Sequence, residues 1–301
     1  MNGNLTSPDI VYTWVKGEDP EYRSMVADYS GKPQHLNPER YRDQFDLLRY
    51  SLRSVEKNFP SYRHLYLVTM RPQVPEWLNL KNPRLRVVHH DEFFAEKKYL
   101  PTFNHNTIES YFHLLPGIQE QFVYMNDDFF LGAPVSQEHF FQNGRPVIYG
   151  SLFGETPRFR IYDGTWLSLG FIEHCPVPVL RSAWAEMQSQ AEREIRITRE
   201  QKFREKHHVR MDRLYTYFML KYRRQACALS PFYATMKKSK FIKIGNSPAR
   251  ELKNLRQLQK RLPLFFCLND DQGDEPNAAV IGHYRNFLES LYPQASPYEK
   301  L

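Results

Sequence analysis

Two apolar runs of the chain end in the same three polar residues. Residues 122–125 and 264–268 are each followed by Asn-Asp-Asp, at 126–128 and at 269–271. Adjacent carboxylates repel one another and resist burial unless a proton or a cation neutralises them. The ordinary alternative is a turn, because Asn and Asp are common turn residues. Two such strand ends in one fold could converge on a single cation.

A divalent cation beside phosphate groups is the chemistry that these residues suit. Mg²⁺ in such sites takes one or two protein carboxylates and completes its shell with water and phosphate oxygens. Asp127 and Asp128 on one side, with Asn269 or Asp270 on the other, would supply that number of ligands. The chain has no GxxxxGK[ST] loop, GxGxxG fingerprint or GxSxG elbow, so P-loop, dinucleotide and hydrolase chemistry are not indicated.

A second pattern has the spacing of metal ligands. His105, Glu109 and His113 are four residues apart, so they would share one face of a helix and could bind zinc. We expect a structural role for them instead.

Composition indicates a globular chain. The 301 residues are 41% hydrophobic and 25% charged, and the aromatic share of 15% is high enough for rings to serve in binding as well as packing. Residues 1–8 do not resemble a secretory signal, and there is no run of 18 apolar residues. The cysteines Cys175, Cys227 and Cys267 are odd in number and far apart, which suits a reducing cytoplasm.

Positive charge is concentrated in one segment. Residues 193–224 contain eleven Lys or Arg against four acids, so this segment alone carries the full net charge of +7. Such a patch would attract a nucleotide, an acidic polymer or an anionic membrane face. The alternative is a solvated helix face with intrahelical ion pairs.

The order of the expected elements predicts the fold class. Short apolar strands separated by helices are typical of a mainly parallel, doubly wound α/β sheet covered on both faces. Ligands of such sheets bind outside the carboxyl ends of the strands, which places residues 126–128 and the end of the first strand, Thr13 and Trp14, at the expected site. Strands are expected at 10–15, 65–69, 85–88, 122–125, 147–152, 241–244 and 264–268, and helices at 41–59, 106–115, within 178–225, and from Pro248 with Ser247 as N-cap.

Taken together and in this order, several long segments resemble the Stealth family of sugar-phosphate transferases. The matching segments are 9–22, 41–69, 74–94 and 100–135, with thinner matches at 173–187, 202–210 and 265–270. Lys16, Gln44 and His208 depart from the family pattern, which leaves the reaction class intact but not the details of donor and acceptor choice.

The resemblance implies transfer of a hexose-1-phosphate from a nucleotide-diphosphate sugar, typically a UDP-sugar, to an acceptor hydroxyl. The product is a phosphodiester and UMP leaves. It also implies a Rossmann-like, GT-A-like fold with an inserted basic helical region. We expect a single catalytic domain over 1–301, made of a nucleotide-sugar-binding part at 8–153, the basic helical insertion at 173–230 and a C-terminal strand–helix part at 240–292.

The resemblance also implies the roles of individual residues. Mg²⁺, or Mn²⁺ in its place, would be held by Asp128 and Asn269. The base is Asp127 or His174, and a carboxylate beside a cation is a weak base, which favours His174. Arg204 would clamp phosphate oxygens. The donor pocket would be formed by Asp9, Tyr12, Thr13, Trp14, Arg42, Asp43 and Asn104.

Two other functions fit parts of the sequence. An ordinary metal-dependent GT-A glycosyltransferase uses the same donors but releases UDP instead of UMP. A nucleic-acid binder would use the basic segment, but no nucleic-acid motif is present and no such partner is expected. We expect a cytoplasmic enzyme of capsule or exopolysaccharide synthesis, acting on a polysaccharide or lipid-linked glycan, with a possible peripheral contact at the inner membrane face.

Overall fold

The computed structural model describes residues 7–31, 42–149, 174–206, 208–230 and 238–300 of the chain. A five-stranded sheet in the order β3-β2-β1-β4-β8 forms its centre, with four parallel strands and β8 antiparallel to β4. These strands are β1 (Asp9–Thr13), β2 (Leu65–Thr69), β3 (Leu85–His89), β4 (Gln121–Asn126) and β8 (Val177–Leu180). This is the mainly parallel α/β sheet that the sequence predicts.

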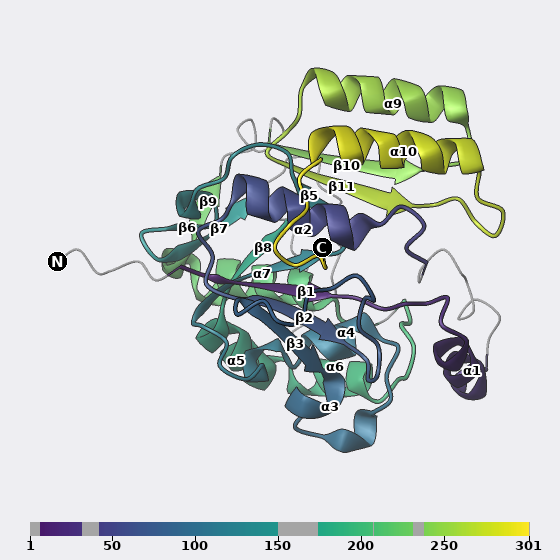
Figure 1. Ribbon diagram of the computed structural model, residues 1–301. Helices are drawn as coiled ribbons and strands as arrows, with labels where there is room; N and C mark the ends of the chain where they lie inside the picture. The colour runs from purple at the N-terminus through teal and green to yellow at the C-terminus, as the bar shows by residue number, and fades with distance from the viewer. Residues whose placement is uncertain (1–6, 32–41, 150–173, 207, 231–237, 301) are drawn as a thin grey trace.

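Helices cover both faces of the central sheet (Figure 1). α2 packs on one face, where Leu48 and Leu52 contact the strand side chains Ile10 and Tyr12 in one buried cluster. On the other face, α5 buries Trp184 completely in a second cluster. The helices are α1 (Pro20–Tyr29), α2 (Leu47–Asn58), α3 (His90–Phe93), α4 (His105–Glu109), α5 (Arg181–Gln190), α6 (Glu192–Arg199), α7 (Met211–Tyr222), α9 (Pro248–Lys260) and α10 (Ala278–Leu291).

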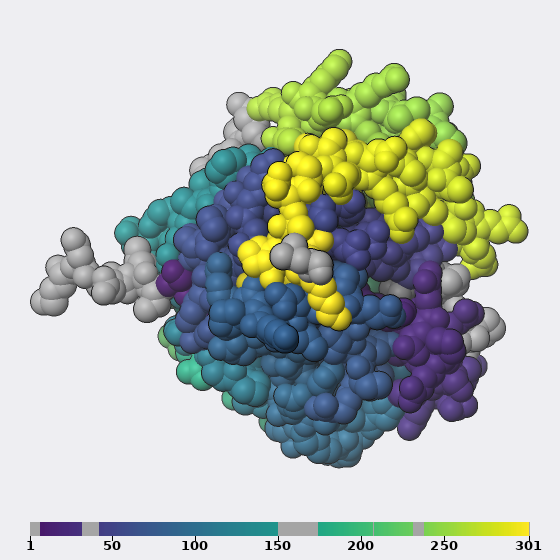
Figure 2. All heavy atoms as spheres, viewed as in Figure 1, coloured from purple at the N-terminus to yellow at the C-terminus, as the bar shows by residue number. Residues whose placement is uncertain are grey.

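A second sheet joins the two halves of the chain. β10 (Ser239–Ile244) and β11 (Phe265–Asp270) are parallel, and β5 (Phe129–Leu131) pairs antiparallel with β11. α9 and α10 cover this sheet, and their apolar side chains pack with Leu47 and Tyr50 of α2. In Figure 2 the C-terminal residues (yellow) lie across α2 (blue), and Tyr298 of this tail is fully buried.

The predicted helices at 41–59 and 106–115 are shorter than expected. α2 begins only at Leu47, because the preceding Asp46 adopts a left-handed conformation with φ of 56°. α4 ends at Glu109, and a separate 3₁₀ turn, Phe112–Leu114, follows. The indole Nε1 of Trp184 donates to the Glu109 carbonyl at 3.2 Å, a carbonyl that a continuing helix would use for its own bond.

The strand predicted at 147–152 does not join the central sheet. Its described part is β7 (Arg145–Tyr149), which pairs with β6 (Phe141–Gln142) and β9 (Ala228–Ser230) in a third sheet. Residues 150–173, which include the end of this prediction, lie outside the described residues. Three further 3₁₀ turns are Lys97–Tyr99, Gln137–His139 and Arg224–Ala226.

The basic segment is helical and pairs much of its charge. Arg196 contacts Glu200 at 2.9 Å, Arg210 contacts Asp212 at 2.8 Å, and the Arg199 guanidinium lies 3.9 Å from the centre of the Tyr111 ring. Among these contacts, the Arg196–Glu200 pair is an intrahelical ion pair of the kind that the alternative expected. Among the described residues, no helix is both long and apolar enough to cross a membrane.

Candidate active site

The turn at Asp127 and Asp128 connects two different sheets. β4 ends at Asn126 in the central sheet, and β5 begins at Phe129 in the sheet of β10 and β11. The chain adds β2 and β3 on one side of β1 and β4 on the other, so the strand order reverses between β1 and β4. Ligands of doubly wound sheets bind at the carboxyl ends of the strands at such a switch point. Thr13 and Asn126, paired in register, lie there.

The second Asn-Asp-Asp strand end meets the first at this turn. The Leu268 amide donates to the carbonyl oxygen of Asp128 at 3.0 Å. Asp128 Oδ2 accepts hydrogen bonds from Cys267 Sγ at 3.2 Å and from Asn269 Nδ2 at 3.4 Å. The structure therefore brings Asp128 and Asn269, the two predicted metal ligands, into direct contact.

The surroundings of the two carboxylates of the turn disfavour their charged forms. Burial raises the pKa of Asp128 to about 6, although the hydrogen bonds from Cys267 and Asn269 act in the opposite direction. Burial also raises the pKa of Asp127 well above its usual range, and the negative charges of Asp128 and Asp43 add to the effect. A bound cation would relieve this repulsion, because it favours the charged form of each acid.

The donor set fits a magnesium ion that is completed by a ligand. Asp128 Oδ1 is buried and has no hydrogen-bond partner among the described residues. Within the same ranges no group of three or more His, Cys, Asp or Glu side chains could hold a metal ion. The metal site at Asp128 and Asn269 therefore stays a prediction, in which water and phosphate oxygens would complete the shell.

The zinc site considered at His105, Glu109 and His113 is not formed. α4 ends at Glu109, and His113 lies in the separate turn that follows, so the three side chains do not share a helix face. The Glu109 carboxylate accepts a hydrogen bond from the Tyr124 hydroxyl at 2.8 Å instead.

Tyr12, Thr13 and Trp14 lie at the carboxyl end of β1. The Tyr12 hydroxyl is 2.7 Å from Ser51 Oγ of α2, and the charge of Asp127 helps to raise the Tyr12 pKa, after burial, which contributes most. Trp14 is 9% exposed, and its indole Nε1 has no hydrogen-bond partner among the described residues. A buried donor of this kind is available to an acceptor atom on a ligand.

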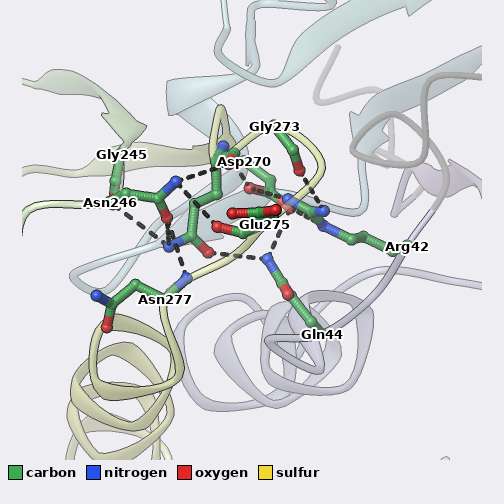
Figure 3. Close-up of polar contacts among 9 residues, drawn as sticks. Arg42, Gln44, Gly245, Asn246, Asp270, Gly273, Glu275 and Asn277 are labelled. Atoms are coloured by element: carbon green, nitrogen blue, oxygen red, sulfur yellow. Dashed lines mark hydrogen bonds and ion pairs between the residues drawn. The ribbon is translucent and has the colours of Figure 1, made fainter.

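Arg42 binds the second strand end rather than pointing into open solvent. Its guanidinium forms a two-pronged ion pair with Asp270, at 2.7 and 3.1 Å, and donates to the Gly273 carbonyl at 2.6 Å (Figure 3). The Gln44 Nε2 donates to the same Asp270 carboxylate at 2.9 Å. The side chains of Arg42 and Asp270 are only 6% and 7% exposed. Both carboxylate oxygens of Asp270, which was considered as an alternative metal ligand, therefore accept hydrogen bonds from Arg42.

Asp43 is half-buried and lies near enough to Asp127 for their charges to interact. Its Oδ1 accepts from the Leu47 amide at 2.7 Å, in the first turn of α2. Burial raises the Asp43 pKa to about 6, and the charge of Asp46 contributes. Asp43 is thus a third acid in this region, and its negative charge helps to raise the pKa of Asp127.

Asp9 lies at the other end of the sheet. It is the first residue of β1, about 13 Å from the carboxyl end at roughly 3.3 Å per residue. Its carboxylate is fully buried and accepts from the Arg63 guanidinium at 2.6 and 2.8 Å and from the Gln119 amide at 2.8 Å. These bonds give Asp9 a structural role at the amino end of β1.

Asn104 connects the sheet to the basic helical region. It caps α4, and its Nδ2 donates to the Thr198 carbonyl at 3.1 Å and lies 3.1 Å from His208 Nδ1. His208, which departs from the family pattern, also accepts from the Glu205 amide at 3.0 Å. Asn104 is fully buried, so these bonds position the segment that carries Arg204.

The two remaining predicted residues lie on different sides of the turn. The His174 ring stacks on Phe241 of β10 with 4.2 Å between ring centroids, and Phe241 is paired in register with Cys267. The His174 backbone is left-handed, with φ of 56°. Arg204 is exposed, and its positive charge acts to lower the pKa of Glu109 on the other face of β4.

Cys267 is a residue of this region that the sequence did not mark as functional, and Glu109 was considered there only as part of the zinc pattern. Cys267 was one of three unpaired cysteines within an apolar strand. Burial and the charge of Asp212 raise the pKa of Glu109 to about 8, so it is protonated at neutral pH.

The protonation of Glu109 predicts how stability depends on pH. Its folded-state pKa lies above the unfolded value of about 4.3, so the folded chain holds the proton more tightly and stability falls as pH rises toward 8. The slope is up to about 1.4 kcal/mol per pH unit. Glu109→Gln keeps an acceptor for Tyr124 and should flatten the melting-temperature profile between pH 5 and 8. Glu138→Gln, at an exposed position, is the control, and equal slopes in all three proteins would contradict the assignment.

Two family models match this chain, Stealth protein CR2, conserved region 2, over residues 40–147, and Stealth protein CR4, conserved region 4, over residues 256–301. The chain belongs to the Stealth family. The first matched region contains the turn at Asp127 and Asp128, and the second contains Asn269. The resemblance read from the sequence is confirmed, and the two strand ends that meet in the structure come from the two matched Stealth regions.

Known relatives of this Stealth chain carry related names. An exopolysaccharide phosphotransferase of Streptomyces coelicolor is 33% identical over 99% of this chain and 52% of its own length. The exopolysaccharide phosphotransferase CpsY of Mycobacterium tuberculosis is 29% identical over 97% of this chain and 58% of its own. The capsular polysaccharide phosphotransferase WcwK of Streptococcus pneumoniae is 26% identical over 97% and 98%. The chain spans about half the length of the first two relatives.

Solved structures resemble this Stealth chain only at a low level. The galactosyltransferase LgtC in complex with donor and acceptor sugar analogues covers 96% of this chain and 98% of its own, at 9% identity and a TM-score of 0.46. The glycosyltransferase GlyE of Streptococcus pneumoniae covers 98% and 66%, at 10% identity and the same score. Similarity of this degree carries no information about substrate or mechanism.

Proposed function

We propose that this chain transfers a hexose-1-phosphate from a nucleotide-diphosphate sugar, most simply a UDP-sugar, to a hydroxyl of a glycan acceptor. The observation that carries the proposal is the contact of Asp128 with Asn269 at the switch point of the sheet. Family membership supports the reaction class, since the named relatives are exopolysaccharide and capsular polysaccharide phosphotransferases.

The donor would lie across the carboxyl ends of β1 and β4. Asp128 and Asn269 would hold Mg²⁺ or Mn²⁺, which would neutralise the charge of the diphosphate when bound. The buried indole N–H of Trp14 is available to donate a hydrogen bond to an acceptor atom of the sugar nucleotide. Thr13 pairs in register with Asn126 at the same edge of the sheet. In the segment before α2, Arg42 holds the second strand end through Asp270, and Asp43 places a negative charge near Asp127.

The reaction is a displacement at the β-phosphorus. The acceptor oxygen forms a bond to that phosphorus, the bond to the bridging oxygen breaks, and UMP leaves with its electron pair. The acceptor proton passes to His174 or to Asp127. His174 is held by its stack on Phe241, while Asp127 has a raised pKa in the absence of a cation. Arg204 would bind a phosphate oxygen of the transferred group, because a guanidinium stays charged and matches phosphate geometry.

The nucleotide product decides between this reaction and its alternative. With a panel of UDP-sugars, Mg²⁺ and a cell-derived glycan acceptor, we expect release of UMP and a new phosphodiester signal in the phosphorus NMR spectrum. Release of UDP with no phosphodiester would contradict the proposal and identify a glycosyltransferase. Excess EDTA should abolish turnover, and unchanged turnover in EDTA would remove the metal from the proposal.

The acceptor is proposed as a polysaccharide or lipid-linked glycan of a capsule or exopolysaccharide. The site is proposed to act in the cytoplasm. Lys202 and Arg199 of the basic segment are already bound to backbone carbonyls and to Ser110 and Gln188, so a peripheral membrane contact would use the remaining exposed cations.

A further inference from the structure

The Cys267 thiol makes a hydrogen bond at this site that has no role in the proposed reaction. Cys267 lies on β11, is fully buried, and donates to Asp128 Oδ2 at 3.2 Å. The same oxygen receives the Asn269 amide at 3.4 Å, whereas Asp128 Oδ1 has no partner among the described residues. The two oxygens of one carboxylate are therefore treated differently: one is held by the protein and the other is left for a ligand.

The thiol acts here as a hydrogen-bond donor and not as a metal ligand. Only the thiolate binds metals strongly. Here the Cys267 S–H group points at the Asp128 carboxylate, to which it donates at 3.2 Å. A carboxylate oxygen is a hydrogen-bond acceptor, so this contact uses the thiol as a donor.

The position of the thiol is fixed by the backbone. Cys267 pairs in register with Phe129, the residue that follows Asp128, and the Leu268 amide donates to the Asp128 carbonyl at 3.0 Å. Cys267 therefore lies within a strand, and Asp128 is the last residue of the turn, tied by these backbone contacts to the start of β5. A contact between rigid elements can hold a side chain within the tolerance that a binding site needs.

We propose that Cys267 is a positioning residue for the cation site: its S–H···Oδ2 bond fixes the Asp128 carboxylate so that Oδ1 is presented to the divalent cation. This inference rests on the proposed function. Hydrogen-bond partners of metal ligands commonly change metal affinity by 10- to 100-fold when they are removed. Because a thiol is a weak donor, the lower end of that range is expected here.

The test measures cation binding directly and without a sugar nucleotide. Free Mn²⁺ is titrated with the purified chain and followed by electron paramagnetic resonance. Cys267→Val removes the donor and keeps the side chain apolar at the cost of one added methyl group, and Cys267→Ser keeps a donor. Cys227→Val is the matched control, because Cys227 is also a buried thiol, donating to the Arg224 carbonyl at 3.2 Å.

We expect Cys267→Val to bind Mn²⁺ about tenfold more weakly than the wild type, with Cys267→Ser and Cys227→Val close to the wild type. A role in packing alone predicts the opposite order for the two Cys267 variants, because serine is the poorer substitute in an apolar strand. Equal Mn²⁺ affinity in wild type and Cys267→Val would overturn this inference and leave the proposed function standing. A wild type that binds no Mn²⁺, even after UDP is added to supply phosphate oxygens, would overturn the metal site itself.

Discussion

Asp128→Ala should reduce turnover by about a thousandfold or more while the protein remains folded. Asp128 is the residue at which the two Asn-Asp-Asp strand ends touch. Its buried Oδ1 has no hydrogen-bond partner among the described residues. Removing it takes away the anionic ligand that holds the cation against the diphosphate. The loss should appear in kcat and kcat/KM, because the neutralisation is needed most as the leaving group departs.

The same substitution should not destabilise the fold. Burial raises the Asp128 pKa to about 6, so the ionised side chain is unfavourable in the folded chain at neutral pH and its contribution to stability decreases as pH rises through that value. Asp128→Ala is expected to melt at or above the wild-type temperature at pH 7.5. Asp271→Ala is the matched control: it belongs to the second strand end, is half exposed, and pairs with the exposed Lys243 at 2.9 Å. A folded Asp128→Ala protein within tenfold of wild-type turnover would contradict the site.

The edge of the sheet could be located from local sequence. Apolar runs of four to six residues followed by Asn-Asp-Asp mark strand ends, and parallel strands present their carboxyl ends at one edge. That reasoning placed Thr13 and residues 126–128 together, and the register of β1 with β4 agrees with it. The contact between Asp128 and Asn269 was also expected, but only as one of two possibilities, because nothing local shows that two distant strands pair.

The features that local sequence could not reveal depend on contacts between distant residues. The helix at 106–115 had a continuous apolar stripe, yet Trp184 takes the Glu109 carbonyl that would have extended it. Arg42 was expected in the donor pocket, and its partner Asp270 lies 228 residues away in sequence. Asp9 has the residue type of a ligand, but Arg63, two residues before β2, binds it at the opposite end of the sheet. No periodicity carries that information.

Asp270→Ala should lower the free energy of unfolding by about 3–5 kcal/mol, because it leaves the Arg42 guanidinium buried without its counter-ion. Both side chains are less than a tenth exposed, so solvent cannot replace the lost carboxylate. Asp270 also accepts from Gln44 Nε2 and from the Gln272 amide, which lose their acceptor in the same variant. Urea unfolding at pH 7.5 measures the change, and Asp271→Ala, one residue away at the surface, should change stability by less than about 1 kcal/mol.

The pair and the network around it can be separated by a double substitution. Arg42→Met with Asp270→Leu removes both charges together and should recover most of the stability lost in Asp270→Ala, because the destabilisation comes from an unpaired buried charge and not from the loss of an attraction. The network in Figure 3 links the segment before α2 to Asn246 and Asn277, through Gln272, beside the strand end that carries Asn269. The double variant should therefore fold but bind the cation less tightly, since the strand end has lost its polar support. If Asp270→Ala and Asp271→Ala proved equally mild, the Arg42 ion pair would not be what holds these two parts of the site together.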